Sequence, residues 1–249
     1  MKDEFMKLSE LRDLLRPENV QQSIFNNFEN SIKEILGKYA VFMSLEKELQ
    51  KINAEAWEFF KTEIASQMLA LKNGRGYEAF LNIVNQVYAY SYLKDRLGCS
   101  NVAFIKTDEK ETPDLEADLD GVKVLCEVKT INPSDDEVRR RNIIKNGGVV
   151  VGVVQNKLPD RFFGKLNSIL KKAKSQLLSY LNGGVAHKLI FLVINFDDIF
   201  GEYKEEFYVQ IDAHLQGNPL GDFELVIFNK KTAFYKDIAM KSATVVNDA

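Results

Sequence analysis

The sequence predicts an α/β protein with a helical extension at its N-terminus, and three observations lead to this class. Apolar residues recur at three- and four-residue steps through the first 72 residues, which is typical of helices. Two strand-like segments meet at Asp120-Gly121, a pair that favours a tight hairpin turn. Residues 188–196 (KLIFLVINF) are almost continuously apolar, which indicates a central strand covered on both faces.

Residues 1–72 are predicted to form a helical N-terminal domain without a catalytic motif. One helix is expected at 19–36, with Pro17 just before it, and a second at 45–71. Asn73-Gly74 then supplies a helix stop.

Residues 73–249 alternate between helix-like and strand-like segments and are predicted to form the α/β domain. The expected elements are a helix at 76–97, strands at 101–106, 114–120 and 122–130, a helix at 160–181, and strands at 188–196, 206–211 and 223–229. Residues 132–159 interrupt this series. They are expected to form a mobile basic loop followed by an extra strand at the apolar run VVVGVV.

Composition narrows the classes of function. No apolar run approaches the ~20 residues that cross a bilayer, and the charged N-terminus does not resemble a secretory signal. Two cysteines fit reduced thiols in a cytoplasmic protein better than a disulfide framework. Two histidines make a His-rich zinc site or a His-based triad a poor expectation. Any chemistry is therefore expected to use carboxylates and lysine.

The net charge of −3 conceals a basic block between Val138 and Lys174. This block contains ten basic residues and one acid, Asp160. It is expected to contact a phosphate backbone, although a solvated helix face with a basic loop would give the same pattern. The candidate nucleic-acid-binding residues are Arg139, Arg140, Arg141, Lys145, Lys165 and Lys172.

The candidate site combines Asp114 with the triplet Glu127-Val128-Lys129. Alternate side chains of a strand share a face, so Glu127 and Lys129 are expected on one side, and the hairpin would bring Asp114 beside them. Two carboxylates and the Val128 carbonyl suit Mg²⁺ or Mn²⁺, while Lys129 would stabilise charge at phosphorus. If the register differs, Glu116 or Asp118 would replace Asp114. The acids could instead form the solvated face of an edge strand.

This pattern resembles the PD-(D/E)XK nuclease superfamily over roughly residues 75–196. Pro113-Asp114 and the Glu127-x-Lys129 triplet match its central motif. Glu78 stands where the family's helix glutamate is expected, and Gln176 begins a Q-x-x-x-Y sequence. The resemblance implies a restriction-endonuclease-like mixed central sheet flanked by helices. It also implies that Glu78 completes a second metal position and that Gln176 orients the nucleophile or a phosphate.

The expected function is therefore that of a metal-dependent endonuclease that hydrolyses DNA phosphodiester bonds with Mg²⁺ or Mn²⁺. One alternative is a nuclease-fold module that binds nucleic acid or protein without cleavage. Another is a helical-scaffold interaction protein in which the Glu-x-Lys triplet has no catalytic meaning. A homodimer or a larger complex is compatible with the sequence, and no membrane partner is expected.

Overall fold

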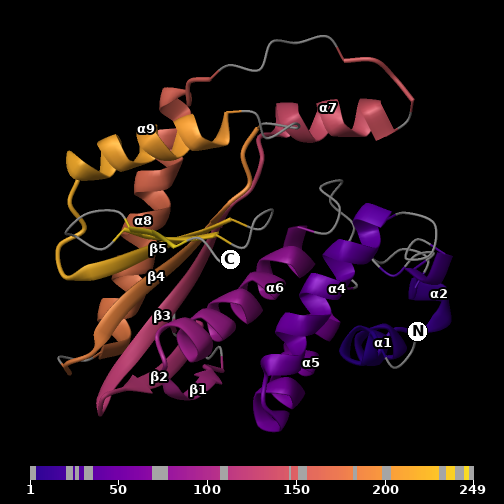
Figure 1. Cartoon of the computed structure of the whole chain (residues 1–249), viewed down its shortest axis with the longest axis horizontal. Helices are drawn as coiled ribbons and strands as arrows, with labels where there is room; N and C mark the ends of the chain where they lie inside the picture. The colour runs from indigo at the N-terminus through magenta and orange to yellow at the C-terminus, as the bar shows by residue number, and fades with distance from the viewer. Residues whose placement is uncertain are drawn as a thin grey trace. The chain divides into compact units, whose positions relative to one another are not determined.

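The structure is a computed structural model of the 249-residue chain. It describes residues 4–20, 25, 28–30, 36–68, 78–106, 112–145, 147–150, 156–181, 184–197, 203–229, 234–238 and 244–246. The chain forms two compact units (Figure 1). The first comprises Met1–Phe104 with Ala117–Leu119, and the second comprises Ile105–Glu116 with Asp120–Ala249.

The first unit is built mainly of helices and runs to Phe104, whereas the predicted helical domain ends at residue 72. Its elements are α1 (Met6–Asp13), α2 (Pro17–Val20), α4 (Leu36–Lys51), α5 (Ala54–Met68), α6 (Glu78–Ser91), a π-helical turn (Tyr92–Arg96) and strand β1 (Ser100–Phe104). The predicted single helix at 45–71 is wrong, because Asn53 separates α4 from α5. The Asn53 side-chain oxygen accepts the Ala56 N–H at 2.8 Å and caps the new helix. Much of the predicted helix at 19–36 lies outside the described residues.

The second unit carries most of a mixed sheet whose strands follow chain order from β1 to β7. Its elements are β2 (Leu115–Leu119, of which the last three residues belong to the first unit), β3 (Val122–Ile131), α7 (Asp135–Lys145), α8 (Asp160–Leu181), β4 (His187–Ile194), α9 (Lys204–Gln216), β5 (Phe223–Asn229), β6 (Phe234–Ile238) and β7 (Thr244–Val246). Strand β4 pairs in parallel with β3 and with β5, whereas β5, β6 and β7 pair antiparallel. The predicted central strand at 188–196 is thus confirmed.

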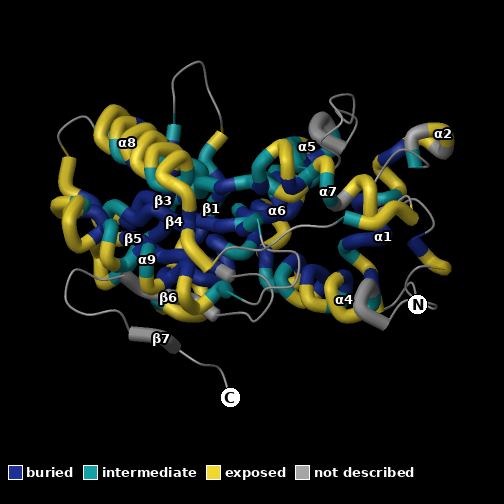
Figure 2. The backbone as a smooth tube through the Cα atoms, turned by 90° about the horizontal axis from the view of Figure 1, so that it is seen from above, coloured by how far each residue is buried: buried dark blue, intermediate teal, exposed yellow. Residues whose placement is uncertain are grey.

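The core of the second unit lies where α8 and α9 pack on one face of the parallel strands. Strand residues of this core include Leu125, Ile131, Ile190, Leu192, Leu225 and Ile227. Figure 2 shows β3 and β4 buried in the interior, and α8 exposed along its outer side. Because side chains alternate along β3, Glu127 and Lys129 share the face of Leu125 and Ile131. The register places these two polar residues opposite Ile190 and Leu192, so the core face itself carries the charged pair.

Two expectations about the second unit are wrong. The predicted strand at 206–211 lies within helix α9, where Phe207, Ile211 and Leu215 recur at helical spacing and are all buried. The expected loop after β3 contains helix α7. Its start is capped by Ser134, whose hydroxyl accepts the Glu137 N–H at 3.2 Å, as in a Ser-x-x-Glu capping box. Most of the VVVGVV run lies outside the described residues.

The Asp120-Gly121 turn between β2 and β3 has positive φ at both residues, 50° and 81°. A Cβ atom on Gly121 would meet nothing within 4 Å, so Gly121→Ala tests the backbone conformation alone. We expect this change to lower the free energy of unfolding by about 1–2 kcal/mol, measured by urea denaturation. Gly164→Ala is the matched control, because Gly164 lies within helix α8 and is equally unobstructed. It should raise stability by up to ~1 kcal/mol, and a loss in Gly164→Ala equal to that in Gly121→Ala would refute the turn argument.

Candidate active site

Asp114 is held against β3 by two hydrogen bonds. Its N–H donates to the Cys126 carbonyl at 3.1 Å, and its Oδ2 accepts the Val128 N–H at 2.7 Å. The other two acids of this strand have different partners. Glu116 pairs with Lys123 at 2.7 Å, and Asp118 accepts a hydrogen bond from the Asn101 amide at 2.9 Å. Of the three acids, Asp114 is therefore the one that the structure brings to the Glu-x-Lys triplet.

Glu127 is a carboxylate buried on the core face of β3, with 1% of its surface exposed. Its Oε1 accepts a hydrogen bond from the Lys129 ammonium. Its Oε2 is buried and has no hydrogen-bond partner among the residues that the structure describes. Burying an oxygen without a hydrogen bond costs about 1–3 kcal/mol of folding free energy, or more when the group is charged. A fold therefore retains such an oxygen where another interaction offsets this cost.

The surroundings of Glu127 favour its protonated form. Burial is the largest cause, the negative charge of Asp114 is the next, and together they raise the pKa of Glu127 to about 8. Lys129 and Lys172 act in the opposite direction and lower this pKa without cancelling the effect of burial. The influence of Asp114 means that two carboxyl groups share one small region, where a further positive charge would stabilise both in their ionised form.

Lys129 links the Glu127 carboxylate to helix α8. Its ammonium donates to Glu127 and, at 2.7 Å, to the side-chain oxygen of Gln176. Gln176 is 8% exposed and lies on the inner face of α8 beside Ala173 and Leu177. Tyr180, the last residue of the Q-x-x-x-Y sequence, is exposed. The structure thus brings Asp114, Glu127, Lys129 and Gln176 together within the second unit.

The remaining candidates occupy other positions. Glu78 is the first residue of α6 and belongs to the first unit, so its role at a second metal position stays a prediction.

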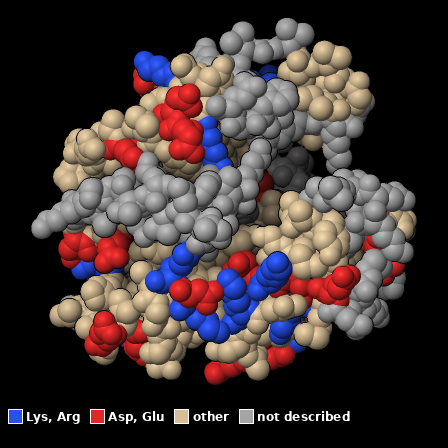
Figure 3. Space-filling model, viewed as in Figure 1, with Lys and Arg blue, Asp and Glu red and all other residues tan. Residues whose placement is uncertain are grey.

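The predicted basic contacts are divided between α7 and α8. Arg139 and Arg140 lie on α7, not in a loop, and pair with Asp136 at 3.0 Å and Glu137 at 2.8 Å. Arg141 and Lys145 are the remaining basic residues of α7, and their side chains lie outside the described part of the chain. Figure 3 shows Lys and Arg side chains interleaved with Asp and Glu on the face in view.

Lys165 and Lys172 are the candidates that α8 carries. Lys165 lies seven residues before Lys172, and Lys172 lies four residues before Gln176, so the three side chains share one face of α8. Lys165 donates to the Asn132 carbonyl at 3.0 Å, and the positive charge of Lys172 acts on Glu127. These two lysines are the predicted basic residues that the structure connects with the candidate site.

Asp114, Glu127 and the Val128 carbonyl form the candidate donor set for a divalent cation. Within the described ranges, no group of three or more His, Cys, Asp or Glu side chains is placed to hold a metal. Mg²⁺ sites commonly use one or two carboxylates and complete their coordination with waters and substrate phosphates. Asp114, Glu127 and the Val128 carbonyl fit that description, and the unpartnered Glu127 Oε2 is the atom that a cation would compensate.

Sequence reasoning missed two asparagines that directly follow the parallel strands. Asn132 follows β3 and Asn195 follows β4, and their side chains meet at 3.4 Å. Nearby, Asp197 accepts the Ser134 N–H at 2.8 Å, which gives this acid a structural partner in the loop before α7. Their position at the carboxyl ends of parallel strands was the available signal, because ligands of open α/β sheets bind there.

No family model matches this chain, and no curated protein or solved structure is significantly similar to it. Within the described residues, no helix is both long and apolar enough to cross a bilayer.

The raised pKa of Glu127 predicts how stability changes with pH in the metal-free protein. Because the folded protein holds this proton more tightly than the unfolded chain, the associated stability is present below pH ~4.5 and is lost as the pH rises toward 8. The loss should be on the order of 4 kcal/mol, at about 1.4 kcal/mol per pKa unit. Glu127→Gln should abolish it, as measured by urea denaturation between pH 5 and 8.5. Glu116→Gln is the control, and a pH profile unchanged in Glu127→Gln would contradict the assignment.

Proposed function

We propose that this chain is a metal-dependent nuclease with a restriction-endonuclease-like core, which hydrolyses DNA phosphodiester bonds. One observation carries the proposal. Glu127 is buried with an unpartnered oxygen, beside Asp114 and in contact with an ammonium that is itself held by Gln176. A purely structural carboxylate at this position would be expected to have both oxygens satisfied.

Asp114 and Glu127 would hold Mg²⁺ or Mn²⁺ with the Val128 carbonyl as a third oxygen. When bound, the cation supplies Lewis-acid polarisation of a phosphoryl oxygen and neutralises negative charge at the site. Asp114 is suited to this task because the Val128 N–H fixes one of its oxygens at 2.7 Å. Binding also offsets the repulsion between the two carboxylates, which is one of the causes of the raised Glu127 pKa.

Lys129 would position the attacking water and stabilise the negative charge that develops on the phosphoryl group. Its ammonium has three N–H donors, of which Glu127 and Gln176 take two. The third is available for a substrate or water oxygen. Gln176 would act as a positioning residue, because its buried amide sets the direction of the Lys129 side chain rather than contacting the reacting atoms.

A polyanionic substrate fits the charge along α8. Lys172 lies four residues before Gln176, and Lys165 lies seven residues before Lys172, so the three side chains project from one side of the helix. Phosphates beside the cleaved bond could follow these lysines. Contacts of this kind are independent of sequence and weaken as salt concentration rises.

The proposal predicts Mg²⁺- or Mn²⁺-dependent cleavage that each of three substitutions reduces by ~10²-fold or more. The substitutions are Asp114→Asn, Glu127→Gln and Lys129→Met. Cleavage is measured on plasmid, linear, single-stranded and branched DNA, with RNA of matched sequence included. Glu116→Gln and Lys123→Met are the matched controls, because this surface pair lies on the same two strands and is exposed.

The outcomes separate nuclease activity from its alternative. Equal activity in the three site variants and the two controls would reject the assigned site. Salt-dependent nucleic-acid binding by the parent protein, with no cleavage under any metal condition, would identify a binding module on this fold instead.

Gln176 gives a second test of the same arrangement. Gln176→Ala should reduce kcat about tenfold or more with little change in KM, since it removes an acceptor of Lys129 but no expected substrate contact. Ser175→Ala, at an exposed neighbouring position on α8, should match the parent. Thermal unfolding measured in parallel excludes a folding defect. A variant with normal kcat and a lowered melting temperature would show that Gln176 serves stability alone.

A further inference from the structure

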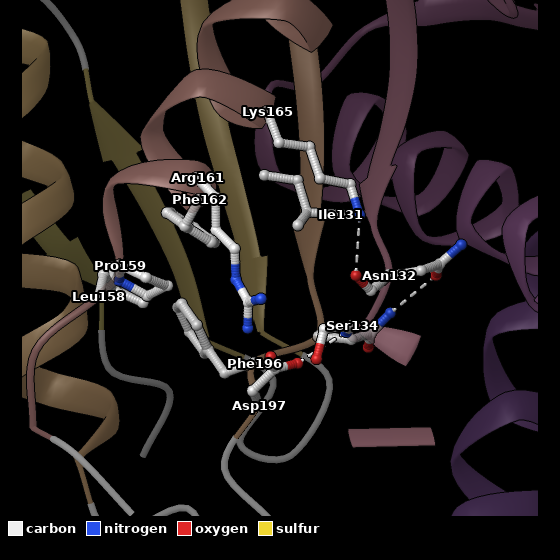
Figure 4. A pocket seen from close by; sticks show the side chains of 11 residues that line it. Ile131, Asn132, Ser134, Leu158, Pro159, Arg161, Phe162, Lys165, Phe196 and Asp197 are labelled. Carbon is white, nitrogen blue, oxygen red and sulfur yellow. Dashed lines mark hydrogen bonds between the residues drawn. The ribbon is translucent and has the colours of Figure 1, made fainter. Parts of the chain in front are cut away.

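A cavity of about 270 Å³ opens in the second unit where β3 and β4 end and α8 begins (Figure 4). Its lining comes from the segment after β3, from the segment after β4, and from the first turns of α8. Because β3 and β4 are parallel, their carboxyl ends lie at the same edge of the sheet, which is where α/β proteins bind ligands. Apart from Lys165, none of these residues has a role in the proposed catalysis, so the cavity needs its own explanation.

One wall of the cavity is flat and apolar. It includes the rings of Phe162 and Phe196, whose centroids lie 6.1 Å apart with an angle of 29° between their planes, together with Leu158 and Pro159. Pockets for small ligands usually measure about 300–1,000 Å³, so this cavity holds roughly one ring system. A flat aromatic wall of this extent suits a planar heterocycle, because each nucleobase has a face that can stack on an aromatic ring.

The opposite wall supplies hydrogen-bonding groups. Asn132 contributes its backbone carbonyl, because its side-chain amide points away from the cavity and accepts a hydrogen bond from Asn195 (Figure 4). Asp197 contributes a carboxylate that also accepts the Ser134 N–H. Carboxylates pair with the edges of nucleobases, in particular with an exocyclic amino group. The combination therefore favours a base that carries an amino group.

Arg161 brings an uncompensated positive charge to the cavity. Figure 4 shows its side chain extending across the cavity toward Phe196 and Asp197. Within the part of the chain that the structure describes, Arg161 makes no hydrogen bond or ion pair. Lys165 lies one turn further along α8 and uses one of its three N–H donors on the Asn132 carbonyl. Both cations stand at the positive end of the α8 dipole, so the rim of the cavity suits a phosphate.

The cavity is connected to the candidate active site along β3 and α8. Ile131, which lines the cavity, lies four residues after Glu127 on β3. At about 3.3 Å per residue, the two residues are ~13 Å apart along the strand. On α8, Lys172 and Lys165 project from one side between Gln176 and the cavity. A strand with one phosphate at Glu127 would reach the cavity after about three or four stacked nucleotide steps, at ~3.4 Å each, and sooner where it is unstacked.

We propose that this cavity receives a single nucleobase from the nucleic-acid strand that the active site cleaves. The base lies against Phe162 and Phe196, its edge meets Asp197, and its phosphate contacts Arg161 and Lys165. This proposal rests on the proposed nuclease function and adds a means of reading one position of the substrate. A base enters such a pocket by leaving its stack, which costs least in single-stranded, mismatched or damaged sites.

The test moves one abasic site along an oligonucleotide. Affinities are measured with the full chain carrying Glu127→Gln, which prevents cleavage, and the cleavage position is mapped with the parent protein. One abasic position, within four steps of the cleaved bond, should weaken binding about tenfold, whereas the other positions should have little effect. Arg161→Gln and Phe162→Leu should each remove this position dependence. Lys171→Gln, an exposed change on the same helix, should preserve it.

The outcomes distinguish the cavity from the catalytic site. A flat abasic profile with normal metal-dependent cleavage overturns the nucleobase proposal and leaves the nuclease proposal intact. A second outcome is that binding depends on the abasic position and on Arg161, while cleavage is unchanged by Asp114→Asn and Lys129→Met. This outcome supports the nucleobase proposal and rejects the assigned catalytic residues. A third outcome is a flat abasic profile in a protein that free nucleoside 5′-monophosphates stabilise against heat, provided that Arg161 is present. This outcome overturns the proposal that the base comes from a nucleic-acid strand and identifies a free nucleotide as the ligand.

Discussion

The Glu127 carboxylate lies on the core face of β3, and its burial constrains everything around it. A charge in that position has lost its hydration, so neighbouring groups must compensate it or it must hold a proton. The structure supplies one ammonium, from Lys129, and a second carboxylate, from Asp114, whose charge makes ionisation harder. Among the described residues, therefore, one Glu127 oxygen has a hydrogen-bond partner and the other has none. This incomplete compensation is the physical basis for inferring a cation.

The fold keeps this arrangement rigid by building it from three independent elements. The Asp120-Gly121 turn returns the chain so that the Val128 N–H fixes Asp114. The parallel register with β4 holds Glu127 and Lys129 over the core, and α8 covers them with Gln176. The same helix begins at the cavity that follows β3 and β4. The proposed catalytic site and the proposed base pocket thus lie along one helix–strand pair, so their spacing is set by regular secondary structure.

Local patterns predicted the elements of this region well where one pattern dominated. The Asp-Gly turn, the bounds of α8 and the buried strand β4 each follow from short-range rules of turn chemistry, helix periodicity and continuous apolarity. Helix α9 was misread as a strand because its aromatic and branched residues also favour strands, and the packing of Phe207 and Ile211 on the sheet decided the outcome. Helix α7 was missed although the Ser134 hydroxyl caps it at the Glu137 N–H, since its composition is charged and lacks an apolar face.

For the site, the sequence by itself determined that Glu127 and Lys129 share a face, because alternation along a strand is a local property. It also placed Gln176 on the inner side of its helix through a spacing of apolar residues. Only the tertiary structure decided among Asp114, Glu116 and Asp118, because that choice depends on the hairpin register and on which acids find partners elsewhere. The unpartnered Glu127 oxygen and the cavity next to Ile131 likewise could not be predicted from the sequence. Both arise from segments more than thirty residues apart, and their contacts exist only once α8 has packed across the parallel strands.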